Sequence, residues 1–518
     1  MKNIIQNKLK MIITVCVIVI AILILIGGIR GKAGNPIGYQ NVNDTTLGGP
    51  FELSNSTARY ALVESIVKNH SLYLNQDLAK FSAPDVVLYK GKFLSIFTPG
   101  VSLLAVPFYI LGNKFGLPQL FTYLFTTIIA FANVFLIAKL SQKLGASKSA
   151  SLISGFIFLF ATNAFAFAFG LTQHHLSVFL IVSSLIFAAG EKNWKNYTLF
   201  GIALGLATMI DIPNLIMLAP VGIYMLVKSF RIEVDSKKVS KLRINLKAVG
   251  VIIGIVPMIL IFGWYNKNTA GSFIKLAQNI GRTEIFSTSA GRNAFLTSDD
   301  LQKEAESTLP PTFSLPFQTR HQLNGFYILL FSDERSWLYY SPVVLLALIG
   351  FIFALKRESK DITIVVISII LLDILLYSMF GDPYGGWSFG ARYLIPGVAL
   401  MSAGVGVFLT YNKSKIMYVI FVLLLGYSIV VNGLGALTTN AVPPKVEAVN
   451  LSKPIPYTYK YNWQLINSGQ ETSLIYNLAL SKKFSGLVYF YVYASMSVLL
   501  FVFLNTLYFI EKRKEKNV

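Results

Sequence analysis

Long apolar runs alternate with short polar segments along most of the chain. An apolar helix of about 20 residues spans the hydrocarbon layer of a bilayer, and inside lipid each backbone polar group has to be paired within its own structure. The pattern therefore predicts an all-α polytopic membrane protein with about 12 transmembrane helices. The predicted helices cover residues 11–28, 118–139, 149–169, 176–189, 197–210, 213–229, 248–266, 337–355, 361–380, 393–410, 415–437 and 486–510.

One further apolar segment does not fit a full crossing. Residues 98–113 read TPGVSLLAVPFYILGN, which is short for a span and contains two prolines and two glycines. We therefore expect a re-entrant or interfacial helix at this position. Counting it as a span would also move the three lysines of KLSQKLGASKS (139–149) to the outer side, against the positive-inside rule.

Basic residues gather in alternate loops and predict the orientation of the chain. The segment 228–247 carries seven lysines and arginines against two acids, and KRESKD (356–361), YNKSK (411–415) and the C-terminal EKRKEKNV are basic too. Short cationic loops are held in the cytoplasm. We therefore expect a multi-pass protein of the cell membrane whose N- and C-termini are cytoplasmic.

With this orientation every long loop lies on the outer side. The predicted parts are a first transmembrane helix (1–28), a first outer loop with surface helices (29–117), core transmembrane helices (118–266), a second outer loop (267–336), C-terminal transmembrane helices with an outer motif at 381–396 (337–437), a third outer loop (438–485), and a last transmembrane helix with a basic cytoplasmic tail (486–518). Apolar positions at helical spacing place one surface helix at 56–69.

Composition supports the membrane assignment and argues for membrane lipids, not nucleic acid, as partners. Of the 518 residues 54% are hydrophobic and 13% are charged, and the mean hydropathy is +0.60. The net charge of +21 lies in short loops between apolar runs, which is typical of contact with membrane lipids and argues against a nucleic-acid partner. The single cysteine, Cys16, excludes an intrachain disulfide and a cysteine-based zinc site.

Polar residues at the outer ends of the predicted helices are the candidates for chemistry. Arg392 precedes an apolar helix, where its planar guanidinium favours a phosphate or carboxylate partner. In the same segment, GDPYGGWSFGARYLIP (381–396), Tyr384 and Trp387 belong either to an interfacial aromatic belt or to a substrate cavity. The surface helix adds Arg59 and Tyr60.

Several other outer residues have two interpretations. Asp211 either caps the helix that begins at Pro213 or has a functional role. Lys90 and Lys92 contact either lipid headgroups or a substrate phosphate. His174 is followed by a second histidine, and adjacent histidines on a helix point in different directions, so this pair predicts no metal site.

Five segments together resemble a known family. They are STARYALVESIVKNHSLYL, YKGKFLSIFTPGVSLLAVPFYILG, FGLTQHHLSVFLI, LFGIALGLATMIDIPNLIMLAPVGIY and YGGWSFGARYLIP. In this order they look like the prokaryotic membrane glycosyltransferases of the GT-C class, relatives of the protein O-mannosyltransferases and lipid A aminoarabinose transferases. The resemblance covers roughly residues 10–400 and implies a GT-C-like bundle.

The resemblance implies a polyprenyl-phosphate-sugar donor, an extracytoplasmic glycan, lipid or protein acceptor, and inverting transfer with a first-loop acid as general base. Relatives usually carry Asp or Asp-Glu after the first span. This chain has Asp44 and Glu52 in that loop, and we predict Glu52 because a Gly-Gly-Pro turn precedes it and Arg59 follows seven residues later.

The remaining roles combine the position of these residues at the outer ends of the helices with the same resemblance. Donor-phosphate binding is assigned to Arg392, Arg59, Lys90 and Lys92. The substrate cavity is assigned to Tyr60, His174, Asp211, Tyr384 and Trp387. No cofactor is predicted, and the need for a divalent metal stays open.

The predicted chemistry needs few groups. A lipid phosphate is a fair leaving group, so the protein has mainly to neutralise charge with Arg or Lys and to take a proton from the acceptor hydroxyl with a carboxylate. The alternatives are a polysaccharide polymerase or ligase of another polytopic class, and a transporter or flippase of lipid-linked sugars.

Overall fold

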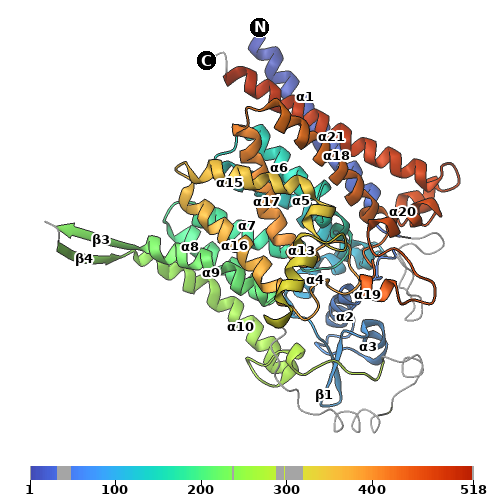
Figure 1. Cartoon of the computed structure of the whole chain (residues 1–518). Helices are drawn as coiled ribbons and strands as arrows, with labels where there is room; N and C mark the ends of the chain where they lie inside the picture. Colours follow the sequence, from blue (N-terminus) through green and yellow to red (C-terminus); the bar gives the residue numbers. More distant parts are fainter. Residues whose placement is uncertain (1, 32–47, 236–237, 287–296, 298–318, 516–518) are drawn as a thin grey trace.

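The computed structural model describes residues 2–31, 48–235, 238–286, 297 and 319–515. The described chain is mostly helical, as predicted, with two short antiparallel hairpins. Helices cover all twelve apolar runs that the sequence predicts as spans. Figure 1 shows them packed side by side, with α1 running along α21.

Seven of these helices are long and apolar enough to cross a bilayer. They are α1 (Lys2–Gly28), α5 (Pro118–Lys143), α10 (Gly250–Ala270), α16 (Lys360–Ser378), α17 (Ile395–Tyr411), α18 (Lys415–Leu437) and α21 (Gly486–Glu515). An eighth candidate span is broken, because α6 (Lys148–Phe160) and η1 (Asn163–Phe169) meet at 64°.

The other predicted spans are shorter helices. They are α7 (His174–Ala188), α8 (Trp194–Ile210), α9 (Pro213–Ser229), and the run of α14 (Trp337–Tyr340), η5 (Pro342–Leu346) and α15 (Ala347–Leu355). A helix of about 16 residues rises only about 24 Å, less than the hydrocarbon thickness of about 30 Å. By length and composition the described chain has seven or eight candidate spans plus shorter apolar helices, and the number of about 12 crossings stays a prediction.

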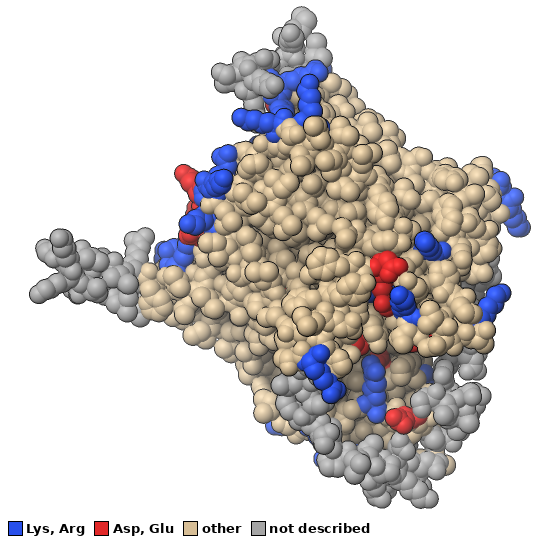
Figure 2. Space-filling model, viewed as in Figure 1, with Lys and Arg blue, Asp and Glu red and all other residues tan. Residues whose placement is uncertain are grey.

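The segments predicted to be cytoplasmic meet at one end of the helices. The Tyr411 hydroxyl donates to the Gly145 carbonyl at 2.9 Å, and the Ser149 amide donates to Glu511 at 2.7 Å. At this end β3 (Phe230–Asp235) and β4 (Lys238–Ile244) form a hairpin where the sequence predicts only a basic loop. The alternating residues of FRIEVD and KVSKLRI suit strands. Figure 2 shows lysines and arginines along this end and a largely uncharged belt below it.

The segments predicted to lie outside meet at the opposite end. Here are α2 (Ser54–Lys68), α3 (Gln76–Ser82), β1 (Val86–Tyr89), β2 (Lys92–Ser95), α4 (Gly100–Lys114), η3 (Ala277–Asn279), η4 (Thr319–His321), α13 (Gln322–Leu330), η6 (Arg392–Leu394), α19 (Lys445–Ala448), α20 (Tyr459–Asn467) and η7 (Tyr476–Leu480). Short η2 (Leu246–Val249) precedes α10. We call this end the outer end; its exposure outside the cell stays a prediction.

Helix α4 lies across the outer end and does not run from one end of the bundle to the other. Its start is fixed by Thr98, whose hydroxyl donates to the carbonyl of Ile210 at the end of α8 at 2.8 Å. One turn later Ser102 donates to the Arg59 carbonyl in α2, and Phe108 packs on Phe125 near the start of α5. These contacts suit the interfacial helix that the sequence predicts.

Candidate functional site

A group of basic residues lies at the outer end, where α2, α7 and the segment before α17 meet. Arg59 on α2 is 2% exposed, and its guanidinium lies 4.1 Å from the centre of the Phe97 ring. It donates to the Asn55 carbonyl at 2.9 Å, while its Nε has no hydrogen-bond partner among the described residues. A buried guanidinium with an unused N–H group is costly unless an anion completes it.

The charges around Arg59 are mixed. Burial lowers the pKa of Arg59 to about 10, the nearby carboxylates of Asp211 and Asp85 raise it, and the charge of Arg392 lowers it. Two guanidinium groups are therefore close enough to repel each other across the site. An anion bound between them would relieve that repulsion.

Arg392 is held by a glycine-rich turn. Gly385 has a φ of 72°, and a Cβ atom there would lie 3.1 Å from the Arg392 Nε, so the backbone approaches the guanidinium closely. The Nε of Arg392 is buried and has no hydrogen-bond partner among the described residues. Tyr393 follows and stacks on Tyr377 of α16 with ring centres 4.8 Å apart. Backbone and rings thus fix the guanidinium in place.

Asp211 joins this group from the turn between α8 and α9. It accepts a hydrogen bond of 3.4 Å from Gln173, and burial raises the pKa of Asp211 to about 6 although Arg59 opposes the shift. The alternative of a helix cap is not what the structure shows, since α9 begins at Pro213 and its N-cap residue is Ile212, with no side-chain cap hydrogen bond. Asp211 therefore contributes a carboxyl group to the cluster.

His174 completes the cluster. Its side chain is 4% exposed, and its Nε2 has no hydrogen-bond partner in the described part of the chain. The ring packs edge-on against Phe167 at 5.2 Å and lies near the charges of Arg392 and Arg59. The predicted residues Arg59, His174, Asp211 and Arg392 thus come together from four separate parts of the sequence.

Two acids near the cluster were not assigned a role from the sequence. Asp382 lies close to the charge of Arg392, and burial raises the pKa of Asp382. Asp85 is 3% exposed, accepts from Ser54 at 2.6 Å and pairs with Arg282 at 2.7 Å. The sequence signal for Asp382 was its place in the glycine-rich 381–396 segment, whereas Asp85 had no distinguishing neighbour.

Arg335 anchors the loop that carries Arg392. It is fully buried and donates to main-chain carbonyls at Tyr384 (3.0 Å), Gly386 (3.3 Å) and Val442 (3.0 Å). It also donates to the carbonyls of Glu334 and Tyr457. Because these carbonyls belong to two outer loops, Arg335 holds the two loops against each other.

Tyr384 and Trp387 lie on the side of this loop that faces the third outer loop. Trp387 donates through its indole N–H to Glu447 at 2.6 Å, and the Ser388 amide donates to the Val442 carbonyl at 2.8 Å. The contacts described for these side chains do not include Arg59 or His174. Their assignment to the substrate cavity stays a prediction.

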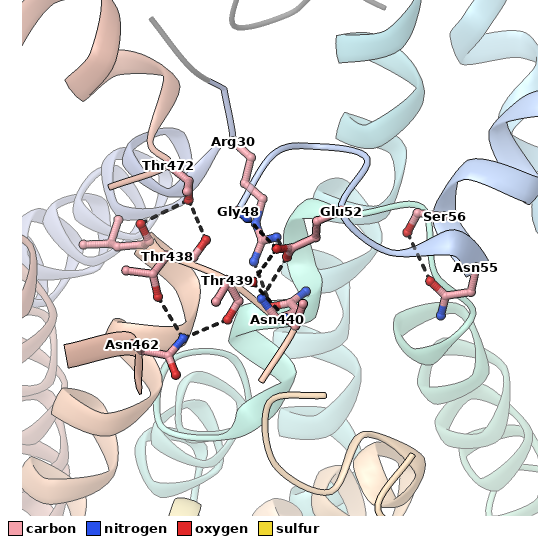
Figure 3. A network of polar contacts seen from close by, with 12 residues as sticks. Arg30, Gly48, Glu52, Asn55, Ser56, Thr438, Thr439, Asn440, Asn462 and Thr472 are labelled. Carbon is pink, nitrogen blue, oxygen red and sulfur yellow. Dashed lines mark hydrogen bonds and ion pairs between the residues drawn. The ribbon is translucent and has the colours of Figure 1, made fainter. Parts of the chain in front are cut away.

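Glu52 lies in a second buried network, shown in Figure 3. Its Oε1 forms a short ion pair with Arg30 and accepts from the Asn440 amide at 2.8 Å. Its Oε2 accepts from the Gly48 amide at 2.6 Å and from the Thr439 hydroxyl. The side chains of Glu52 and Arg30 are only 3% and 4% exposed. Glu52 thereby joins the first outer loop to the third.

The other predicted site residues lie elsewhere. Tyr60 is 2% exposed and packs in an aromatic core with Phe51 and Tyr109 at ring distances of 5.0 and 5.8 Å. Lys90 and Lys92 are exposed on the β1–β2 hairpin, and their described contacts do not include Arg59 or Arg392. Asp44 lies outside the described residues.

A small pocket opens beside the Glu52 network, between the end of α1 and the start of α5. Arg30, Gln119 and Thr127 supply polar atoms to it, and its apolar lining includes Leu120 and Leu124. No group of three or more His, Cys, Asp or Glu side chains placed to hold a metal ion occurs within the described ranges.

The structure is similar to solved structures of two membrane proteins. ArnT from Cupriavidus metallidurans in the apo state has a TM-score of 0.48 and 13% identity, over 95% of this chain and 76% of that one. The same protein bound to undecaprenyl phosphate has a TM-score of 0.48 and 13% identity, over 96% and 78%. The oligosaccharyltransferase AglB from Archaeoglobus fulgidus, in complex with an inhibitory peptide and a dolichol-phosphate, has a TM-score of 0.41 and 12% identity, over 86% and 57%.

One ArnT structure contains undecaprenyl phosphate, and the AglB structure contains a dolichol-phosphate. No family model matches the sequence, and no curated protein matches it.

Proposed function

We propose that this protein is an integral membrane glycosyltransferase. It moves a sugar from a polyprenyl-phosphate donor to an acceptor hydroxyl at the outer end, on the extracytoplasmic side, with inversion at the anomeric carbon. The observation that carries the proposal is the cluster of Arg59, His174 and Arg392, whose buried nitrogen atoms have unused hydrogen-bonding capacity at the ends of apolar helices.

The cluster suits the leaving group of this reaction. When the bond between the sugar and the lipid phosphate breaks, negative charge develops on the phosphate oxygen. Arg59 and Arg392 supply fixed N–H donors and positive charge for that oxygen at the depth of a lipid headgroup, and no solvent has to reorganise around them. A neutral sugar substrate without phosphate would leave the unused N–H groups of Arg59 and Arg392 without an anionic acceptor.

The second requirement is a proton acceptor for the attacking hydroxyl. We propose a carboxylate of the first outer loop, Glu52 or Asp44, for this role. Glu52 already accepts hydrogen bonds from four donors, so it acts as a base only if one of them moves away. The variants Glu52→Gln and Asp44→Asn distinguish these two candidate bases.

The test is sugar transfer by the purified protein in proteoliposomes. The donors are polyprenyl-phosphate hexoses and pentoses labelled in the sugar, and an extract of cell-envelope glycans, lipids and proteins supplies the acceptor hydroxyls. The expected result is transfer of label from the lipid to the acceptor fraction together with release of polyprenyl phosphate. A flippase would move the lipid and leave the sugar attached. Arg59→Gln is expected to abolish transfer, whereas Lys453→Gln, an exposed change on the third outer loop, is expected to leave it unchanged. Transfer that survives in the Arg59 variant would contradict the proposed phosphate site.

A further inference from the structure

The β1–β2 hairpin and the segment after α10 form one surface that the proposed transfer does not use. The Tyr73 hydroxyl donates to the Asn268 carbonyl near the end of α10. Gly271 ends α10 with a φ of 79°, and a Cβ atom there would lie 3.2 Å from the Tyr89 hydroxyl. In Figure 1 the hairpin lies beside the lower end of α10. The two segments are therefore fixed to each other.

Lysines cover this surface without acids between them. Residues 86–95 and 267–278 contain four lysines and no aspartate or glutamate. Lys90 and Lys275 lie over the Tyr89 ring at 5.5 and 4.6 Å, and Lys92 lies over the Tyr73 ring at 4.3 Å. The ammonium groups thus lie against aromatic rings, and their N–H donors that point away from the rings can bind anions.

The chain after α10 turns back along the helix. Phe273 packs its ring against Gly263, where an added Cβ atom would lie 1.9 Å from the ring. Gly263 is seven residues before the end of α10, which corresponds to about 10 Å along the helix axis. The next residue, Ile274, is 85% exposed although it is strongly apolar. The segment thus presents an apolar side chain alongside the span and not away from it.

The neighbouring surface of α10 is itself apolar and exposed. Ile259, Leu260 and Trp264 are 48%, 55% and 54% exposed, and α10 is the candidate span with the smallest buried share among those described. A surface of this kind in a spanning helix faces lipid. Ile274 follows Phe273, which contacts Gly263 on α10, and Lys90 and Lys275 lie over the Tyr89 ring next to the end of this helix.

We propose that this surface, made of Lys90, Lys92, Phe273, Ile274 and Lys275, binds bilayer phospholipids, with Ile274 inserted among acyl chains and the lysines on anionic headgroups. The exposed apolar residue, the aromatic rings and the lysines are the combination that membrane interfaces select. The hairpin would thereby hold the first outer loop at a fixed height above the membrane. The lipids meant here are those of the bulk bilayer and not the donor.

The first experiment measures the depth of residue 274. A nitroxide is attached to Ile274→Cys in a Cys16→Ser background, and the protein is reconstituted in vesicles of phosphatidylcholine and phosphatidylglycerol. Accessibility to oxygen is expected to exceed accessibility to a water-soluble nickel chelate. The matched control, Ser452→Cys on the third outer loop, is expected to show the reverse, and a water-accessible label at residue 274 would overturn the insertion.

The second experiment measures lipid preference. The Lys90→Gln/Lys275→Gln variant is compared with Lys453→Gln/Lys482→Gln, which removes the same charge from exposed positions elsewhere at the outer end. Spin-labelled phosphatidylglycerol is expected to lose its preference over phosphatidylcholine by up to about fivefold for each surface lysine removed, and less in the control. Unchanged lipid preference combined with lost binding of soluble polyphosphate would assign the surface to a polyanionic acceptor and overturn the proposal.

Discussion

Replacing Glu52 by glutamine tests what the buried network contributes. The amide keeps the shape of the side chain, but its NH2 group would face two donors in either orientation, because each carboxylate oxygen accepts two hydrogen bonds. It also leaves Arg30 without its charge partner while 96% of that side chain is buried. Breaking a buried ion pair from one side costs about 3–5 kcal/mol. We expect Glu52→Gln to lower the free energy of unfolding by that amount.

The assay is thermal unfolding of the purified protein beside the transfer rate. Glu64→Gln is the matched control, because it removes a carboxylate that pairs with the largely exposed Lys68 at 3.0 Å, a kind of pair that contributes about 1 kcal/mol or less. A Glu52→Gln protein as stable as the control would refute the argument from the network. A stable variant that also transfers sugar about a hundredfold more slowly would instead identify Glu52 as the base. If only Asp44→Asn removes turnover, Asp44 is the base.

Three further outcomes follow from the cluster and the topology. Arg392→Lys keeps the charge but loses the planar fork, so turnover should fall about ten- to a hundredfold; unchanged kinetics would leave Arg392 a structural role. The pKa of Asp211 is raised to about 6 in the folded protein, so its carboxylate destabilises the fold as pH rises from about 4 to 6. Asp211→Asn should therefore stabilise the protein above pH 6 and not below pH 4, in unfolding measured against pH. Finally, cysteines at Lys413 and Lys453 in a Cys16→Ser background should react oppositely with an impermeant thiol reagent in intact cells, and equal labelling would contradict the predicted orientation.

The helices were predictable because their signal is local. A long apolar run specifies a helix whatever its neighbours are, and all twelve predicted runs are helical, although only seven or eight of them are long enough to span a bilayer. The break between α6 and η1 was not predicted, because 149–169 reads as one continuous run. The β1–β2 hairpin was missed as well, since its strands are only four residues each and depend on Ala277 and Ile280 from a distant segment for their apolar core.

Individual residues of the site could be predicted from the sequence, but which of them lie together in the fold could not. Arg59, His174, Asp211 and Arg392 were recognised because ionisable groups next to apolar helices are costly. Lys90 and Lys92 also lie next to an apolar helix in the sequence, but the β1–β2 hairpin places them beside the end of α10 and not in the cluster. Arg335 was not assigned a role, because nothing in the neighbouring sequence shows that four carbonyls from distant loops converge on it.

The hydrogen bonds of Arg335 hold the outer loops together without using the side chains of those loops. Its described hydrogen bonds all end on backbone carbonyls, which every amino acid provides. Side chains at Tyr384, Val442 and Tyr457 can therefore be exchanged without removing an acceptor from the anchor. For engineering, this makes the rim between the two loops a surface on which side chains can be varied while the hydrogen bonds of Arg335 to the loop that carries Arg392 are retained.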